Sequence, residues 1–347
     1  MRLKRSLLAG VMLATLVLTL GLGCAAQPGA GSDGEGASGE KITWTLDTYF
    51  PAGLYLSKGV QDFCDGVNAR SDGGFVIEPV YGSALGVAGP DVANALGAGT
   101  FEADYTAFPY LSTDMPVMGI MGLPMLCKNT YEGFMSDFVL QPYYRSELAT
   151  RNIVQVGGLW SFPRQIVWSK TPVRTMDDFK GMTFRAGSAE ATLLMDKLGA
   201  DVISMAQPEV YTALQRGMLD AILGSTATAI GVSAWEVLDY GIDLTVSLGG
   251  SGLIINQDAW NELPAKYQVI VTEEASRVAA DLNKKAITEG ELGWQQLVSK
   301  GIERINPDAS LADEIAVLAA PIWDQWAQQK GGVAAQALAE LRTVLGR

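Results

Sequence analysis

The chain has 347 residues, of which 48% are hydrophobic, and its formal net charge is −13 at pH 7. Such acidity argues against nucleic-acid binding, which needs a cationic surface. The absence of histidine removes the commonest general base and metal ligand, and the two scattered cysteines Cys64 and Cys127 make no zinc site. We therefore expect neither an enzyme nor a cofactor or metal site, although acidic, lysine and tyrosine side chains keep an enzyme as an alternative.

The first forty residues predict export. A basic MRLKR start precedes an uncharged apolar run, which is typical of a signal peptide over residues 1–23. The run ends in a sequence that resembles a bacterial lipoprotein cleavage box, with Gly21 in place of the usual leucine, so we expect lipidation of Cys24. Ordinary cleavage near Ala25 is the alternative. Residues 24–40 are rich in Gly, Ser and Ala and predict a flexible tether between a membrane anchor and a folded body.

Strands and helices alternate through the first half of the folded body. Residues rich in alternating or continuous apolar side chains predict strands at 41–47, 74–81, 100–106 and 153–160. Helical spacing predicts helices at 53–70, 90–96 and 130–149. This alternation predicts an α/β fold with a mainly parallel sheet.

Two cysteines fall within this half, Cys64 and Cys127. In an oxidising compartment they could pair. However, Cys64 lies on a helix face and Cys127 follows an apolar run. We therefore favour two separate buried thiols.

The central stretch contains a candidate anion receptor. Arg185 closes the strand-like sequence TFRAG, and Ser188 is a suitable N-cap for a helix that Gly199 ends. A cation at the carboxyl end of a strand, beside the free N–H groups of a helix start, is a natural site for an anion. The alternative is that Arg185 is a solvated surface charge.

The last third is mainly helical. Strand character returns at 244–256, and a helix begins after Pro264 and extends in bent form to Lys300. At about 1.5 Å per residue, such a helix is longer than one small domain needs. Residues 311–345 predict two amphipathic helices that are separated at Gly331 and Gly332.

Three segments of the chain, residues 170–185, 198–205 and 208–221, carry a resemblance to a known family. They read KTPVRTMDDFKGMTFR, LGADVISM and PEVYTALQRGMLDA, and this spaced series resembles the DctP-like solute-binding proteins of tripartite ATP-independent periplasmic (TRAP) transporters. The resemblance implies a two-lobed periplasmic-binding-protein fold with an interdomain cleft and a long helix that crosses both lobes.

The resemblance also suggests boundaries. Lobe I covers residues 41–163 plus parts of 256–347, and lobe II covers residues 164–255. Residues 256–347 supply the long crossing helix and the C-terminal helices.

The family's ligand-binding residues can be carried onto this chain. The arginine that ends the G-x-x-x-R element clamps the ligand carboxylate in the family, and Arg185 matches it; Arg164 matches an assisting arginine. Further candidates near the expected cleft are Trp160, Ser188, Gln207, Tyr110, Tyr49, Phe50 and Trp235. For the aromatic ones, core packing is at least as good an explanation.

The resemblance implies an extracytoplasmic, lipid-anchored receptor that passes an organic acid to integral-membrane TRAP transporter subunits. The alternatives are a binding protein for an ATP-driven importer or a sensor, or a secreted α/β enzyme. Compared with the sialic-acid branch of the family, Ala107, Tyr110 and Gly224 replace polar residues, which favours a smaller or flatter monocarboxylate, dicarboxylate, keto acid or aromatic acid.

Overall fold

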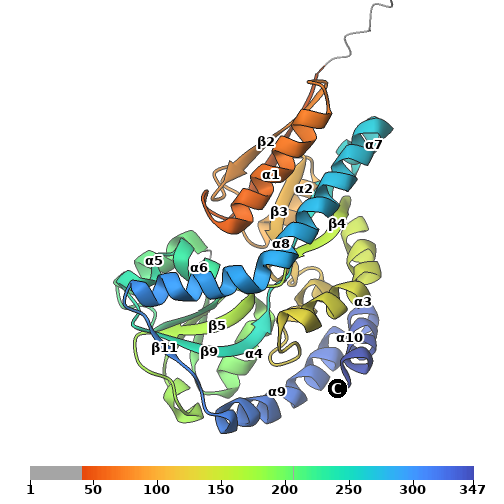
Figure 1. Ribbon diagram of the computed structural model, residues 1–347. Helices are drawn as coiled ribbons and strands as arrows, with labels where there is room; N and C mark the ends of the chain where they lie inside the picture. Colours follow the sequence, from red (N-terminus) through yellow and green to blue (C-terminus); the bar gives the residue numbers. More distant parts are fainter. Residues whose placement is uncertain (1–40, 206) are drawn as a thin grey trace, which may run out of the picture. The chain divides into compact units, whose positions relative to one another are not determined.

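The computed structural model describes residues 41–347 except residue 206 (Figure 1). The expected signal peptide, Cys24 and the tether lie outside the described residues. Two β-sheets with helices packed on them make up the described chain. The predicted α/β class is confirmed.

The first sheet has five strands in the order β2-β1-β3-β10-β4. Strand β1 pairs in parallel with β2 and β3, whereas β10 is antiparallel to β3 and β4. The strands are β1 (Ile42–Thr48), β2 (Phe75–Tyr81), β3 (Ala103–Ala107), β4 (Ile153–Ser161) and β10 (Ser251–Asn256). Residues 164–255 were expected to form lobe II, but they include most of β10, which belongs to this first sheet.

The second sheet has six strands in the order β11-β9-β5-β8-β6-β7. Strand β6 is parallel to both of its neighbours, and β5 is antiparallel to β8 and β9. The strands are β5 (Arg164–Ser169), β6 (Thr183–Ala186), β7 (Asp201–Ser204), β8 (Ala221–Gly224), β9 (Tyr240–Leu248) and β11 (Glu303–Ile305). Arg185 lies on β6, as the sequence predicts.

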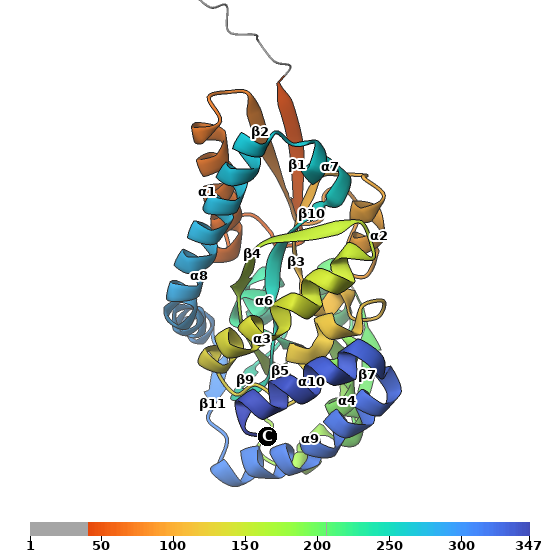
Figure 2. The same ribbon diagram turned by 90° about the vertical axis from the view of Figure 1, so that its right-hand side faces the viewer.

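Helices cover the first sheet on both faces. Figure 2 shows α1 along one side of the strands and α3 on the other. The apolar core under α1 contains Trp44, Leu46 and Phe63 and is separate from the core under α3. The elements of this part are α1 (Tyr55–Arg70), α2 (Asp91–Gly97), α3 (Thr130–Ala149), α7 (Gln257–Glu262) and the 3-10 helices η1 (Phe108–Leu111) and η2 (Pro116–Gly122).

Shorter helices connect strands of the second sheet. They are α4 (Ala189–Lys197), α5 (Gln207–Gln215), α6 (Thr226–Gly231), η3 (Met176–Phe179) and η4 (Ala234–Glu236). Helix α4 begins where the sequence predicts, because the Ser188 Oγ accepts a hydrogen bond from the Ala191 N–H at 3.3 Å. This cap fixes the turn that follows Arg185.

The long helix α8 (Ala265–Ser299) packs on elements of both sheets, as Figure 1 shows. Near its start Tyr267 lies against Phe75, with ring centroids 5.4 Å apart. Near its end Gly293 approaches α6 so closely that a Cβ there would lie 2.7 Å from the Thr226 side chain. The prediction of one long helix that crosses both halves is confirmed.

Two helices end the chain, α9 (Ala309–Lys330) and α10 (Gly332–Leu345). The break falls at Gly331 and Gly332, both with positive φ, which side chains rarely tolerate. The predicted pair of helices is therefore confirmed.

Cys64 and Cys127 are buried and free, and burial raises the pKa of both thiols, that of Cys127 to about 11. The expectation of two separate buried thiols is therefore confirmed.

Within residues 41–347, residue 206 left aside, no helix is both long enough and apolar enough to cross a membrane.

Candidate functional site

Arg185 is a buried cation. Its side chain is only 2% exposed. The guanidinium donates from Nε and Nη2 to the Met205 carbonyl oxygen at 3.2 and 3.0 Å, and from Nη2 to the Tyr110 hydroxyl at 3.4 Å. No carboxylate of the described chain forms an ion pair with it. A buried positive charge held only by neutral groups is costly, and an anion would relieve that cost.

Gly187, in the turn after β6, lies beside this guanidinium. A Cβ added to Gly187 would lie 3.3 Å from Arg185 Nη1 and 3.4 Å from the Tyr110 ring. Glycine therefore leaves space beside Nη1, the guanidinium nitrogen that does not hold Met205 or Tyr110.

A cavity of about 60 Å³ lies at this guanidinium, with walls from both sheets. It brings together five predicted site residues, namely Arg185, Ser188, Tyr49, Phe50 and Tyr110. A second cavity of about 480 Å³ shares Tyr49, Tyr110 and Ser188 with the first and adds Gln207. Six of the predicted ligand-binding residues thus line two adjoining cavities.

Aromatic rings form one wall of the smaller cavity. The Tyr49 ring lies 4.0 Å from that of Phe50 and 5.2 Å from that of Tyr110, between centroids. Burial raises the pKa of Tyr49 well above its ordinary value; Tyr110 and Tyr105 raise it further, and the Arg185 charge opposes them. The Tyr49 hydroxyl therefore stays protonated and can donate a hydrogen bond to a ligand.

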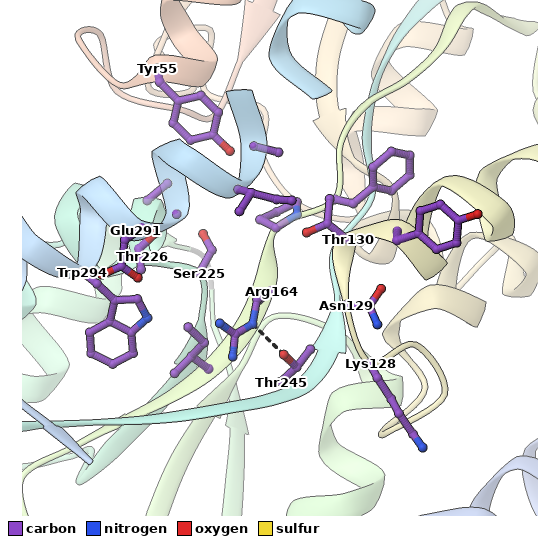
Figure 3. A pocket seen from close by; sticks show the side chains of 18 residues that line it. Tyr55, Lys128, Asn129, Thr130, Arg164, Ser225, Thr226, Thr245, Glu291 and Trp294 are labelled. Atoms are coloured by element: carbon purple, nitrogen blue, oxygen red, sulfur yellow. Dashed lines mark hydrogen bonds between the residues drawn. The ribbon is translucent and has the colours of Figure 1, made fainter. Parts of the chain in front are cut away.

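Arg164 lies in a different cavity. Its Nε donates to Thr245 Oγ1 and its Nη2 to Asp243 Oδ1, both at 2.6 Å. Burial acts to raise the pKa of Asp243, but the hydrogen bond from Arg304 and the charge of Arg164 outweigh it and lower the pKa. Figure 3 shows Arg164 directed to Thr245, in a cavity of about 620 Å³ that Glu291 and Trp294 also line. Arg164 and Arg185 thus line different cavities, which share Pro163 and Ser225.

We expect Arg164→Ala to leave the affinity for an acid bound at Arg185 within about threefold of the wild type, because Arg164 already has its own carboxylate partner in Asp243. Isothermal titration of the folded variant checks this. A loss of tenfold or more would instead assign Arg164 a direct role in binding.

The expectation that Trp160 and Trp235 face the site is not supported by their positions. Trp160 is fully buried, with ring centroids 5.4 Å from Phe63 and 5.0 Å from Tyr105. Trp235 is half-buried beside the core under α5 and α6, and the Lys300 Nζ lies 5.3 Å from its ring centroid. Neither side chain lines the two cavities beside Arg185. Core packing, the alternative for both tryptophans, fits these positions.

Several polar residues of the smaller cavity were not predicted. They are Gln165, Ser225, Thr228, Ser247 and Ser251. For Gln165 the sequence did hold a signal. Successive residues of a strand point to opposite faces, so Gln165 is directed away from the face of β5 that carries Arg164. The other four lie on two segments: Ser225 caps α6 and hydrogen-bonds Thr228, while Ser247 and Ser251 lie on the consecutive strands β9 and β10. These positions explain their local structure, and no pattern in the sequence marks them as cavity-lining.

The chain is similar to proteins of one family over most of its length. Residues 48–330 match the family model of DctP, bacterial extracellular solute-binding protein, family 7. A solute-binding protein of Chromohalobacter salexigens is 24% identical over 83% of this chain and 85% of its own. A monocarboxylate 2-oxoacid-binding periplasmic protein of Nostoc is 25% identical over 74% and 73%.

A solved structure shows the same fold. The crystal structure of an extracytoplasmic solute receptor of Bordetella pertussis, described as binding pyroglutamic acid, is similar with a TM-score of 0.82 and 26% identity, over 86% of this chain and 99% of its own. The match of one family model to residues 48–330 identifies the chain as a member of family 7 of the bacterial extracellular solute-binding proteins, the DctP-like receptors of TRAP transporters.

Proposed function

We propose that this protein captures a carboxylate-bearing organic acid through Arg185 and delivers it to a TRAP-type secondary transporter. The observation that carries the proposal is the buried guanidinium of Arg185, which has no carboxylate partner in the described chain and lines a cavity with walls from both sheets. A ligand carboxylate would supply the missing negative charge.

The chemistry of arginine suits this role. A planar guanidinium can donate parallel hydrogen bonds to both carboxylate oxygens, which a lysine ammonium matches less well. The Met205 carbonyl holds Nε and Nη2 on one side, so the side chain is oriented before a ligand arrives. Preorganisation of this kind lowers the entropic cost of binding.

The binding properties of relatives support a carboxylate ligand. The Bordetella receptor is described as binding pyroglutamic acid, and the Nostoc protein as binding monocarboxylate 2-oxoacids. Both are carboxylates, although they differ in the rest of the molecule. We therefore place the shared recognition at Arg185 and the selectivity in the surrounding walls.

The cellular setting follows from the family, whose members act outside the cytoplasm. We propose that residues 1–23 direct export and that a lipid on Cys24 holds the receptor at the membrane, beside the transporter subunits. Globomycin, which blocks lipoprotein signal processing, would then cause the precursor to accumulate, whereas Cys24→Ala would release the body from the membrane.

Native mass spectrometry of freshly purified protein, followed by thermal-shift screening of carboxylic acids, tests the binding function. We expect a co-purified acid, or one that raises the melting temperature, and a primary amide of the same acid as an inactive control. The proposal fails if no acid binds and the amide or another uncharged solute binds instead.

A further inference from the structure

The two cavities beside Arg185 contain a single charge. Among the described residues that line the cavities of about 60 and 480 Å³, Arg185 alone has an ionisable acidic or basic group other than the tyrosine hydroxyls. By contrast, Lys128, Arg164 and Glu291 line the cavity of about 620 Å³. One cation can neutralise one carboxylate.

The polar groups around Arg185 are neutral. Ser247 and Ser251 are each 1% exposed, and with Gln165 they line the smaller cavity. In the larger one, Gln207 has a buried Oε1 that accepts no hydrogen bond within the described part of the chain. Hydroxyl and amide groups can hydrogen-bond the neutral N–H, O–H or C=O groups of a ligand, but they carry no formal charge that would neutralise a second ligand charge.

The nearest buried acid on α4 is already engaged elsewhere. Glu190 accepts hydrogen bonds from the Ser112 hydroxyl at 2.7 Å and from the Trp326 indole at 3.2 Å. It lines neither cavity beside Arg185. An ammonium group bound in these cavities would therefore lack a carboxylate partner, just as a second ligand carboxylate would lack a cation.

We infer that the site selects small acids that bear one negative charge and only neutral hydrogen-bonding groups elsewhere, such as lactam, hydroxy or keto monocarboxylates. This inference rests on the proposed function and narrows its substrate class. Dicarboxylates and α-amino acids are excluded because each would bury a second, uncompensated charge.

Matched pairs of ligands test the inference on the wild-type mature protein by isothermal titration at pH 7.5. The pairs are pyroglutamate with proline, lactate with malate, and 2-oxobutyrate with 2-oxoglutarate. Whenever one member of a pair binds measurably, we expect the member whose only charged group is one carboxylate (pyroglutamate, lactate or 2-oxobutyrate) to bind at least about 30-fold more tightly than the other.

Failure of the charge selection can be distinguished from failure of the proposed function. A dicarboxylate or amino acid that binds as tightly as its partner, and loses affinity in Arg185→Ala, overturns the charge selection and leaves the proposed function intact. If no acid binds but an uncharged or cationic solute does, both are overturned.

A change of wall charge gives a second test. Gln165→Lys adds a cation to the cavity, so we expect the preference for the singly charged member of a pair to fall by at least about tenfold. Gln165→Met, a neutral side chain of similar length, reports the loss of the amide alone. An equal preference in the lysine and methionine variants would contradict the inference.

Discussion

Arg185→Ala is expected to weaken binding of the organic acid by about 30- to 3,000-fold, from the roughly 2–5 kcal/mol lost when one partner of a buried charge pair is removed. The variant leaves the ligand carboxylate desolvated against neutral groups, namely the Tyr110 hydroxyl and the backbone at Gly187. Isothermal titration with the identified acid measures the loss.

Two controls separate recognition from folding. Arg185→Lys keeps the charge but loses the planar fork, so its affinity should lie between those of the wild type and the alanine variant. Without ligand, Arg185→Ala should melt at the same temperature as the wild type or higher, because it removes a buried charge that lacks a carboxylate partner in the described chain. Unchanged affinity in the folded alanine variant would refute the role of Arg185.

Stability of the ligand-free protein is expected to rise as the pH falls from 8 to 5, because of two buried acids. Asp47 and Asp104 lie in register on the adjacent strands β1 and β3, and their side chains are 1% and 2% exposed. Each has a buried Oδ1 without a hydrogen-bond partner in the described chain. Burial raises the pKa of Asp47 to about 6; burial, with the charge of Asp47, raises that of Asp104 well above its ordinary value.

The direction follows from proton linkage. Both carboxyls bind protons more tightly in the folded chain than in the unfolded chain, where the pKa of aspartate is about 3.9. Their stabilising contribution is therefore complete below about pH 4 and is lost as the pH rises through about 6 for Asp47. Ionisation of Asp47 above that pH buries a negative charge against the Asp104 carboxyl on the neighbouring strand.

Asp47→Asn should flatten this pH dependence and raise the free energy of unfolding at pH 8 by up to about 3 kcal/mol, from a pKa shift of about two pH units. Denaturant titrations at pH 5 and pH 8 measure it. Asp177→Asn, which replaces an aspartate whose side chain is 81% exposed, serves as the control and should keep the wild-type slope. A wild-type protein that is equally stable at both pH values would contradict the prediction.

Much of the fold could be predicted because it depends on local patterns. The helical spacing after Pro264 marks α8, and the strand-turn-cap sequence around Arg185 and Ser188 marks β6 and α4. The assignment of Ser251–Asn256 to the first sheet could not be predicted in this way. It depends on which distant strands pair with β10, and no local signal encodes that choice.

The site was predictable to a similar extent. Arg185 stands at a local anion-binding motif, whereas the partners of Arg164 are Asp243 and Thr245, about 80 residues later in the chain. Whether Trp160 faces a ligand or the core depends on the packing of Phe63 and Tyr105 against it. Sequence identifies the aromatic residue but not the side of the sheet on which its partners lie.

A crystal structure of the mature protein with its co-purified or titrated acid tests the central claim most directly. We predict a ligand carboxylate whose oxygens lie about 2.7–3.2 Å from the Arg185 guanidinium nitrogens, with Tyr49 and Tyr110 against the rest of the ligand. A carboxylate bound instead at Arg164, in the larger cavity beside Glu291 and Trp294, with no ligand at Arg185, would contradict it.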